Sequence, residues 1–92
     1  MDMNRIGIIG GGAWGTALTC VVHRAGREAV LWAREPEVVE AVNRNHENSL
    51  FLPGIALDRA VKATDRLAEA ADVDAVLLVV PAQFLRAVTA EL

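Results

Sequence analysis

Short apolar segments alternate along this chain with segments whose apolar residues recur at helical spacing. The apolar segments are short, rich in Ile, Val and Leu, and bounded by turn residues, which predicts β-strands at residues 5–9, 28–33, 61–63 and 75–80. The segments between them predict helices at residues 14–25, 36–45, 66–71 and 83–92. Residues 48–58 follow neither period, so we interpret them as an ordered loop.

Boundary residues and apolar faces refine these elements. Gly26 suits the end of the first helix, Pro36 the first turn of the second, and Asp65 the cap of the third. The residues expected to face the core are Leu18, Val21, Val22 and Ala25 in the first helix and Val38, Val39 and Val42 in the second. The run at 75–80 is apolar throughout and precedes Pro81, which is typical of a strand buried on both faces.

Alternating strands and helices predict an α/β fold with a parallel sheet and right-handed crossovers. In the doubly wound order 3-2-1-4-5-6, the strands of this chain would be the first four, giving a truncated Rossmann-type sheet of order 3-2-1-4 with helices on both faces. Residues 1–92 are therefore expected to be the N-terminal portion of a dinucleotide-binding domain. The fourth strand would then form an apolar edge that invites association.

A glycine motif directly follows the first strand and directly precedes the first helix. Gly10, Gly12 and Gly15 form the pattern G-x-G-x-x-G, with Ala13 and Trp14 at its variable positions. In this context the pattern predicts a dinucleotide site, because the chain must turn tightly, approach a pyrophosphate and present a helix N-terminus to it. The Trp14 ring could instead pack in the core or against another domain.

The winding of the predicted sheet adds two further groups of candidate residues. The fourth strand would lie beside the first, which places Pro81 and Phe84 across a crevice from the glycine motif. Arg34 directly follows the second strand, where a guanidinium could meet the 2′-phosphate of NADP or stack on adenine. Glu35 could bind the ribose of NAD, but it is also placed to cap the next helix. Taken together, Arg34 and Glu35 favour NADP, or use of both NAD and NADP.

Other reactive residue types do not form a catalytic or metal-binding pattern. Cys20 falls in a helical apolar pattern without a basic neighbour, so we interpret it as a small buried hydrophobe. His23 and His46 lack ligands at metal-binding spacing and suit surface or capping roles. Asp72 and Asp74 flank a turn before the fourth strand, which favours solvated carboxylates. We therefore expect no metal site and no complete catalytic site.

Composition narrows the class of protein further. Of the 92 residues, 53% are hydrophobic and 23% charged, with a net charge of −3, which indicates a folded domain without a basic surface for nucleic acid. The longest apolar run, at 75–82, is far shorter than the ~18 residues that span a bilayer, so we expect no membrane insertion. A single cysteine and the absence of a signal peptide pattern predict a cytoplasmic protein.

Several motifs taken together resemble the NAD(P)-dependent glycerol-3-phosphate dehydrogenases. Besides the glycines, the resemblance rests on L-W-A-R at 31–34, H-E-N at 46–48, F-L-P-G-I at 51–55 and V-V-P-A-Q-F at 79–84, and it covers nearly the whole chain. It implies an oxidoreductase that interconverts dihydroxyacetone phosphate and sn-glycerol 3-phosphate with NAD(P)H and supplies phospholipid synthesis. It also implies a second, helical domain that carries the catalytic lysine, beyond Leu92. Lys62 does not match that lysine.

The resemblance also carries over individual residues. It implies that Ala13 and Trp14 contact the pyrophosphate, that Arg34 meets the adenosine, and that Phe84 lies near the cofactor. Relatives often have Ser or Asn in place of Ala13, so only its backbone contact carries over. Some bacterial relatives have a basic residue in place of Glu35, and the acid weakens the case for strict NADP use.

Two other interpretations are compatible with the sequence. The chain could be the front of another Rossmann dehydrogenase, such as a sugar-nucleotide, hydroxyacyl or ketopantoate enzyme. It could also be a stand-alone dinucleotide-binding module that associates through its fourth strand, as a homodimer. Substrate profiling distinguishes the first from the favoured interpretation, and sedimentation together with NAD(H) titration distinguishes the second.

Overall fold

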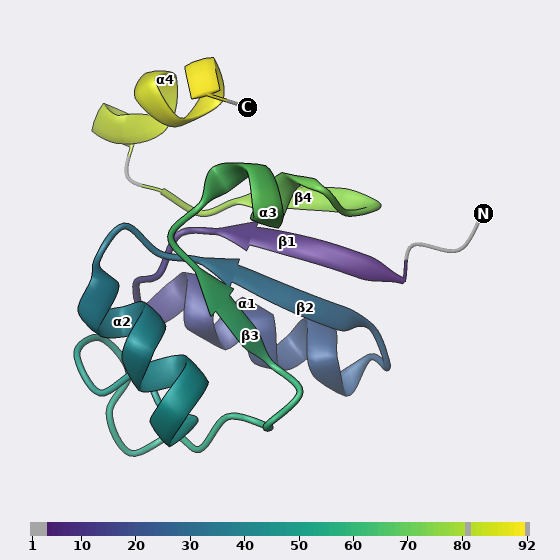
Figure 1. Cartoon of the computed structure of the whole chain (residues 1–92), viewed down its shortest axis with the longest axis vertical. Coiled ribbons are helices and arrows are strands. Elements are labelled where there is room, and N and C mark those ends of the chain that lie inside the picture. The colour runs from purple at the N-terminus through teal and green to yellow at the C-terminus, as the bar shows by residue number, and fades with distance from the viewer. Residues whose placement is uncertain (1–3, 81, 92) are drawn as a thin grey trace.

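The computed structural model describes residues 4–80 and 82–91, and for residues 82–84 it describes the backbone alone (Figure 1). Strands and helices alternate through the chain as the sequence predicts. In chain order the elements are β1 (Arg5–Ile9), α1 (Ala13–Arg24), β2 (Glu28–Trp32), α2 (Pro36–Glu40), the π-helix η1 (Ala41–Asn45), β3 (Lys62–Thr64), α3 (Leu67–Ala71), β4 (Ala75–Leu78) and α4 (Ala82–Glu91).

The strands form one parallel sheet in the order β3-β2-β1-β4, which confirms the predicted Rossmann-type topology. At the centre of the sheet Ile8 pairs with Leu31 on one side and with Leu77 on the other. The chain therefore winds outward from β1 to β3 and then crosses back to β4, as Figure 1 shows. This reversal brings the carboxyl ends of β1 and β4 together.

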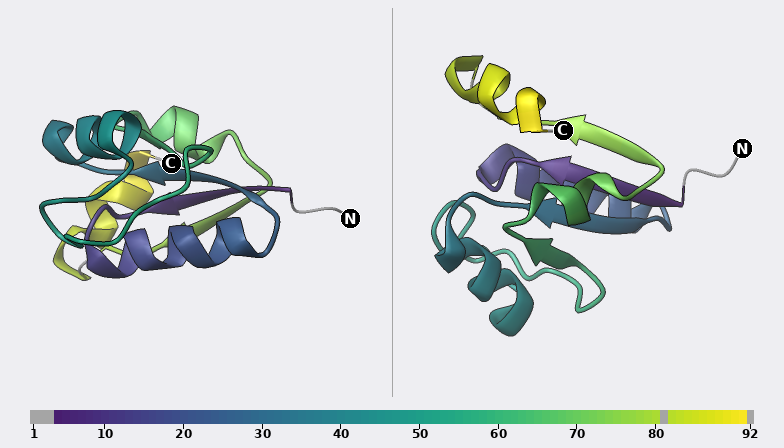
Figure 2. Two further views of the ribbon diagram at one scale, coloured as in Figure 1. Left: turned by 90° about the horizontal axis from the view of Figure 1, so that it is seen from below. Right: turned by 45° about the horizontal axis from the view of Figure 1, so that its top comes forward.

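Two apolar clusters lie on opposite faces of the sheet, since neighbouring strand residues point to opposite sides. The first cluster joins Ile8 and Leu31 to Val22 of α1 and to Val38 of α2. The second joins Ile9, Trp32, Leu67, Ala70 and Val88, which come from β1, β2, α3 and α4. Figure 2 shows α1 and α3 on the two sides of the sheet, so helices cover both faces.

The predicted inner face of α1 is partly wrong. Val22 is buried, but Val21 is 58% exposed and Ala25 is exposed. The residues of α1 that are buried besides Val22 are Gly15, Thr16 and Thr19. Both threonines can be buried because each hydroxyl donates a hydrogen bond to the carbonyl four residues earlier. Leu18 is half-buried, so of the predicted inner face only Val22 is fully buried.

Several boundaries also differ from the prediction. The helix expected at 36–45 changes at Ala41 into a π-helix, in which the side chain of Asn43 exchanges two hydrogen bonds of 2.9 Å with the backbone of Ala63 in β3. Arg66, rather than Asp65, is the N-cap residue of α3, because the first helical bonds, from the N–H groups of Glu69 and Ala70, end at the carbonyl of Arg66.

The expectation that the fourth strand is buried on both faces is wrong. β4 ends at Leu78, and Leu77 and Leu78 are 39% and 43% exposed. The physical reason is its position, because among the described strands β4 pairs with β1 alone and forms the outer strand on its side of the sheet. An apolar run alone does not distinguish a central strand from an edge strand.

Candidate functional site

The glycine motif forms the turn between β1 and α1, and two of its glycines are required by packing. Gly10 has a φ of +138°, and a Cβ atom there would collide with the backbone carbonyl of Val79 beyond β4. A Cβ atom at Gly15 would collide with the carbonyl of Gly10, so this glycine lets α1 begin directly against the turn. Packing of the described chain therefore explains Gly10 and Gly15.

Gly12 is different from the other two. A Cβ atom at this position would meet no described atom within 4 Å, and Gly12 has an ordinary extended backbone with φ −75° and ψ −172°. A larger residue would fit the fold, so packing within the chain gives no reason for a glycine here. Glycine is tolerated at an N-cap, and close approach of a ligand to the backbone is a further physical reason for it, which fits the second glycine of a dinucleotide motif.

The start of α1 presents backbone donors to this open space. Gly12 is the N-cap residue, and its carbonyl accepts bonds from the N–H of Thr16 at 3.0 Å and from its hydroxyl at 2.9 Å. By helix geometry the N–H groups of Ala13, Trp14 and Gly15 have no acceptor within the helix. The N-cap residue provides no side-chain bond to them, and the first turn of α1 contains no acidic residue. Such a helix terminus favours an anion.

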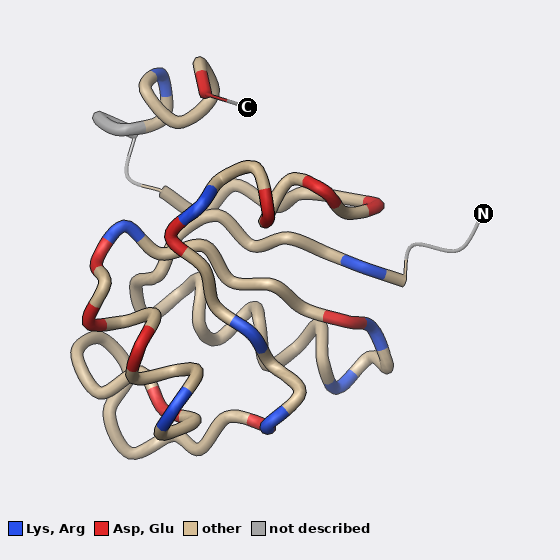
Figure 3. Tube along the Cα trace, viewed as in Figure 1, with Lys and Arg blue, Asp and Glu red and all other residues tan. Residues whose placement is uncertain are grey.

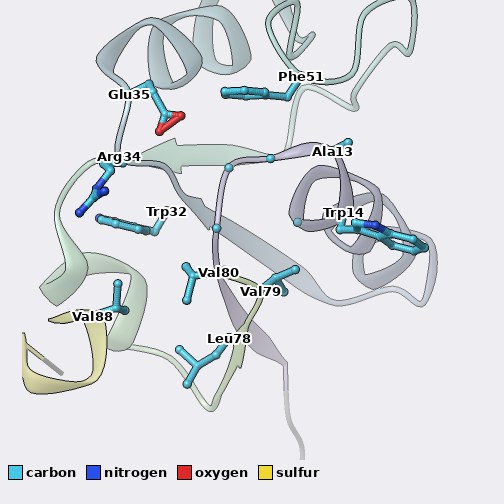
Figure 4. Close-up of a pocket in the computed structure, with 14 residues that line it drawn as sticks. Ala13, Trp14, Trp32, Arg34, Glu35, Phe51, Leu78, Val79, Val80 and Val88 are labelled. Atoms are coloured by element: carbon cyan, nitrogen blue, oxygen red, sulfur yellow. The ribbon is translucent and has the colours of Figure 1, made fainter. Parts of the chain in front are cut away.

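A pocket of about 740 Å³ opens above this helix terminus, at the carboxyl ends of β1, β2 and β4. Its volume lies within the range of about 300–1,000 Å³ typical of small-molecule sites. Figure 4 shows the glycine turn across the middle, Arg34 and Glu35 at the end of β2, and Phe51 from the loop after η1. The remaining lining residues include Trp32, Leu78, Val79, Val80 and Val88.

The structure brings six of the predicted site residues to one pocket. They are Gly10, Gly12, Ala13, Trp14, Gly15 and Arg34. Pro81 lies outside the described residues, and so does the side chain of Phe84, whose backbone belongs to α4. The role of all eight in cofactor binding stays a prediction.

The Trp14 side chain does not pack in the core of the described chain, since it is 80% exposed. In Figure 4 its ring extends from α1 on the side of the turn opposite Arg34. Of the interpretations that the sequence left open, contact with a ligand and contact with another domain therefore remain.

Sequence reasoning missed Phe51 as a pocket residue. It lies on a loop without apolar periodicity, far from the glycines in sequence, and it is 42% exposed. The F-L-P-G run that contains it served only as a family signature. Phe51 reaches the pocket because Asn48 donates a hydrogen bond to Gly11 and thereby holds this loop beside the glycine turn.

The charged groups at the pocket come from the end of β2. Between Arg5 and His23 the chain contains no charged residue, so the glycine turn itself is neutral. Acidic and basic positions are otherwise spread along the trace, as Figure 3 shows. Arg34 is exposed and Glu35 half-buried, and Glu35 is the N-cap residue of α2 without a side-chain bond to the helix. One pocket wall thus offers a cation and a carboxylate as adjacent residues.

Away from the pocket, one carboxylate has a perturbed pKa. The N–H of Ala60 donates to Asp58 at 2.9 Å and, together with His23 at 3.3 Å, holds the pKa of this carboxyl below its ordinary value. This pair joins the loop before β3 to α1. Within residues 4–80 and 82–91, no group of three His, Cys, Asp or Glu residues is placed to bind a metal ion. No helix over the same ranges is long and apolar enough to cross a membrane.

Comparison with known families gives the decisive observation. Residues 5–92 match the family described as the N-terminus of NAD-dependent glycerol-3-phosphate dehydrogenase. The chain belongs to this family. Family membership argues against the interpretation that the chain is the N-terminal part of another Rossmann dehydrogenase, and it agrees with the predicted resemblance.

Individual members of the glycerol-3-phosphate dehydrogenase family are close to this chain. It is 66% identical over 85 residues to glycerol-3-phosphate dehydrogenase (NAD(P)+) of Paramagnetospirillum magneticum, covering 92% of this chain and 31% of that protein. It is 60% identical over 88 residues to the Parvibaculum lavamentivorans protein of the same name, covering 96% and 26%. The glycerol-3-phosphate dehydrogenase structure from Plasmodium falciparum matches with a TM-score of 0.85 and 33% identity, covering 94% and 27%. The chain thus spans about a third or less of these relatives.

Proposed function

We propose that this chain is the cofactor-binding part of a glycerol-3-phosphate dehydrogenase and binds NAD or NADP. The pyrophosphate would lie over Gly12, against the N–H groups of Ala13, Trp14 and Gly15. The observation that carries the proposal is the open space beside Gly12, which packing does not explain and a closely approaching ligand does. The free helix terminus supports it, because it supplies donors and a favourable dipole for an anion.

The adenosine would lie over the end of β2, between Arg34 and Glu35. Arg34 suits the 2′-phosphate of NADP, and Glu35 suits the ribose hydroxyls of NAD. Both side chains line the pocket, which supports use of both cofactors with NADP somewhat favoured. Calorimetric titration with NADH and with NADPH tests this directly. Comparable affinities are expected, whereas failure of both to bind would overturn the proposal.

The longer protein would interconvert dihydroxyacetone phosphate and sn-glycerol 3-phosphate in the cytoplasm, as a step toward glycerophospholipids. The cofactor would carry the hydride, and a lysine outside this chain would assist proton transfer at the substrate oxygen. The described residues supply only binding groups, which supports the proposal that the 92 residues alone are inactive. Oxidation of NADH with dihydroxyacetone phosphate by this chain alone would contradict the proposal that the 92 residues bind the cofactor but do not catalyse the reaction.

Self-association is a second candidate property. β4 is an edge strand, it contains no charged residue, and its Leu77 and Leu78 are exposed, which are the features that favour strand pairing between copies. A homodimer could form there. Sedimentation velocity tests this proposal. A dimer that becomes a monomer on substitution Leu77→Lys would support it, and a monomer at all concentrations of the unmodified chain would contradict it.

A further inference from the structure

Asn48 lies in the loop after η1 and is completely buried, yet its side chain serves the glycine turn. Its Nδ2 donates hydrogen bonds of 2.8 Å to the carbonyl of Gly11 and to the hydroxyl oxygen of Thr16. Its Oδ1 accepts a bond of 3.2 Å from the N–H of Phe51. Both amide hydrogens and the amide oxygen are therefore engaged, and they join the loop to the turn and to the start of α1.

These bonds fix the direction of two successive carbonyls in the turn. Asn48 holds the carbonyl of Gly11, and Thr16 holds the carbonyl of Gly12 with both its N–H and its hydroxyl. The Thr16 hydroxyl also accepts from Asn48, so the three groups form one chain of hydrogen bonds. An anion near the turn would be repelled by a carbonyl oxygen that turned toward it, and these bonds prevent that rotation.

The same bonds set the direction of two donors. A peptide group is planar and trans, so its N–H points opposite to its C=O. When the carbonyls of Gly11 and Gly12 point toward Asn48 and Thr16, the N–H groups of Gly12 and Ala13 must point away from them. These are donors of the pocket-lining turn.

We propose that Asn48 is a positioning residue that orients the peptide groups at Gly11 and Gly12 for the cofactor pyrophosphate. Through its Oδ1 it also holds Phe51 at the edge of the same pocket. This inference rests on the proposed binding of NAD(P), and it assigns the H-E-N segment a role within that site. Loss of Asn48 would release the carbonyl of Gly11 directly and would remove the bond that fixes the Thr16 hydroxyl, so it would weaken every ligand that is bound through its pyrophosphate.

The chain contains a matched control for the structural part of this role. Asn43 is also an asparagine whose carboxamide bonds to backbone, donating to the carbonyl of Ala63 and accepting from its N–H, both at 2.9 Å. Its bonds hold β3 and do not involve the pocket. Asn43→Ala and Asn48→Ala each remove a carboxamide from backbone groups, but only Asn48→Ala releases the glycine turn.

The first measurement needs no ligand. Amide hydrogen exchange is followed by NMR in the full 92-residue chain and in both variants. All exchange rates are corrected for the change in global stability of each variant. After this correction, Asn48→Ala is expected to accelerate exchange at the amides of Phe51 and Thr16 at least tenfold and to leave the rate at Ala63 unchanged. Asn43→Ala is expected to do the reverse. Unchanged exchange at Thr16 in Asn48→Ala would overturn the proposal.

The second measurement titrates each protein with NADH. Asn48→Ala is expected to raise the Kd for NADH at least tenfold, because at least one charge-assisted bond to the pyrophosphate is lost, whereas Asn43→Ala leaves this Kd within about twofold. Equal loss of affinity in the two variants would overturn the positioning role. If the unmodified chain does not bind NADH, the proposed function fails, and the exchange measurement still decides whether Asn48 orders the turn.

Thr16 provides a second route should Asn48→Ala not fold. Thr16→Val keeps the shape of the side chain but removes the hydroxyl between Asn48 and Gly12, and Thr16→Ser retains that hydroxyl. The valine variant is expected to bind NADH at least threefold more weakly, and the serine variant to bind as the unmodified chain does. Equal affinity of the two variants for NADH would contradict the proposed chain of hydrogen bonds.

Discussion

Substituting alanine at Gly12 and at Gly15 separates ligand binding from folding. The added methyl group at Gly12 would enter open space, whereas at Gly15 it would collide with the backbone carbonyl of Gly10. We therefore expect Gly12→Ala to affect mainly binding and Gly15→Ala mainly stability. Both changes add the same methyl group three residues apart, so each serves as the control for the other.

The expected magnitudes follow from these environments. At Gly12, loss of the glycine N-cap lowers the free energy of unfolding by about 0.5–1 kcal/mol. The alanine also restricts the unfolded chain, which raises the free energy of unfolding by about 0.4–1 kcal/mol, so the two effects nearly cancel. At Gly15, forcing α1 away from the turn costs about 1–3 kcal/mol or more. For a domain of this size, that loss lowers Tm by roughly 4–20 °C. The methyl group at Gly12 would also displace the pyrophosphate from one or two N–H groups, weakening NADH binding about 10- to 150-fold.

Urea unfolding and NADH titration measure the two effects on the same samples. The account predicts an almost unchanged unfolding midpoint with a large rise in Kd for Gly12→Ala, and a lowered midpoint for Gly15→Ala. Unchanged NADH affinity in Gly12→Ala would refute the placement of the pyrophosphate over Gly12. Severe destabilisation by the same substitution would refute the conclusion that packing does not require this glycine.

Three further predictions concern charge, pH and fluorescence. Arg34→Ala should weaken binding of NADPH several-fold more than that of NADH, and Glu35→Gln should strengthen NADPH binding, with equal effects on both cofactors contradicting the assignment. Because the pKa of Asp58 in the folded chain is below its ordinary value of 3.8, its stabilising effect is complete above about pH 4 and is lost as the pH falls through the folded pKa. Urea unfolding at successive pH values should show a smaller acid dependence in Asp58→Asn, and an unchanged dependence would exclude this role. In Trp32→Phe the exposed Trp14 is the one tryptophan left in the sequence. Its fluorescence should be quenched fully by iodide and should change when NADH binds, and resistance to iodide would contradict the exposed position.

The sheet order could be predicted because each strand and helix has a local pattern and parallel crossovers have one hand. The inner face of α1 could not, because hydrophobicity alone treats Thr16 and Thr19 as solvent-facing. Their hydroxyls bond within the helix, so burial carries little penalty, and the apolar residue Val21 is left outside. The exposure of Leu77 follows from the edge position of β4, which the strand order predicted, whereas the apolar run by itself indicated burial on both faces.

The candidate site was predictable where it depends on one continuous motif. The glycines follow β1 directly and Arg34 lies two residues after β2, so strand order places them at one edge of the sheet. Phe51 and Asn48 depend instead on a contact between residues 37 positions apart, the bond from Asn48 to Gly11. A loop without periodicity gives no sequence signal for such a contact.

The most direct test of the central claim is an NMR titration of the 92-residue chain with NADH, observing backbone amides. The account predicts saturable one-to-one binding, with the largest shifts at the amides of Gly12, Ala13, Trp14 and Gly15, which should form hydrogen bonds to the pyrophosphate. Absence of saturable binding at millimolar NADH, or shifts confined to other parts of the fold, would contradict the claim that this turn binds a dinucleotide.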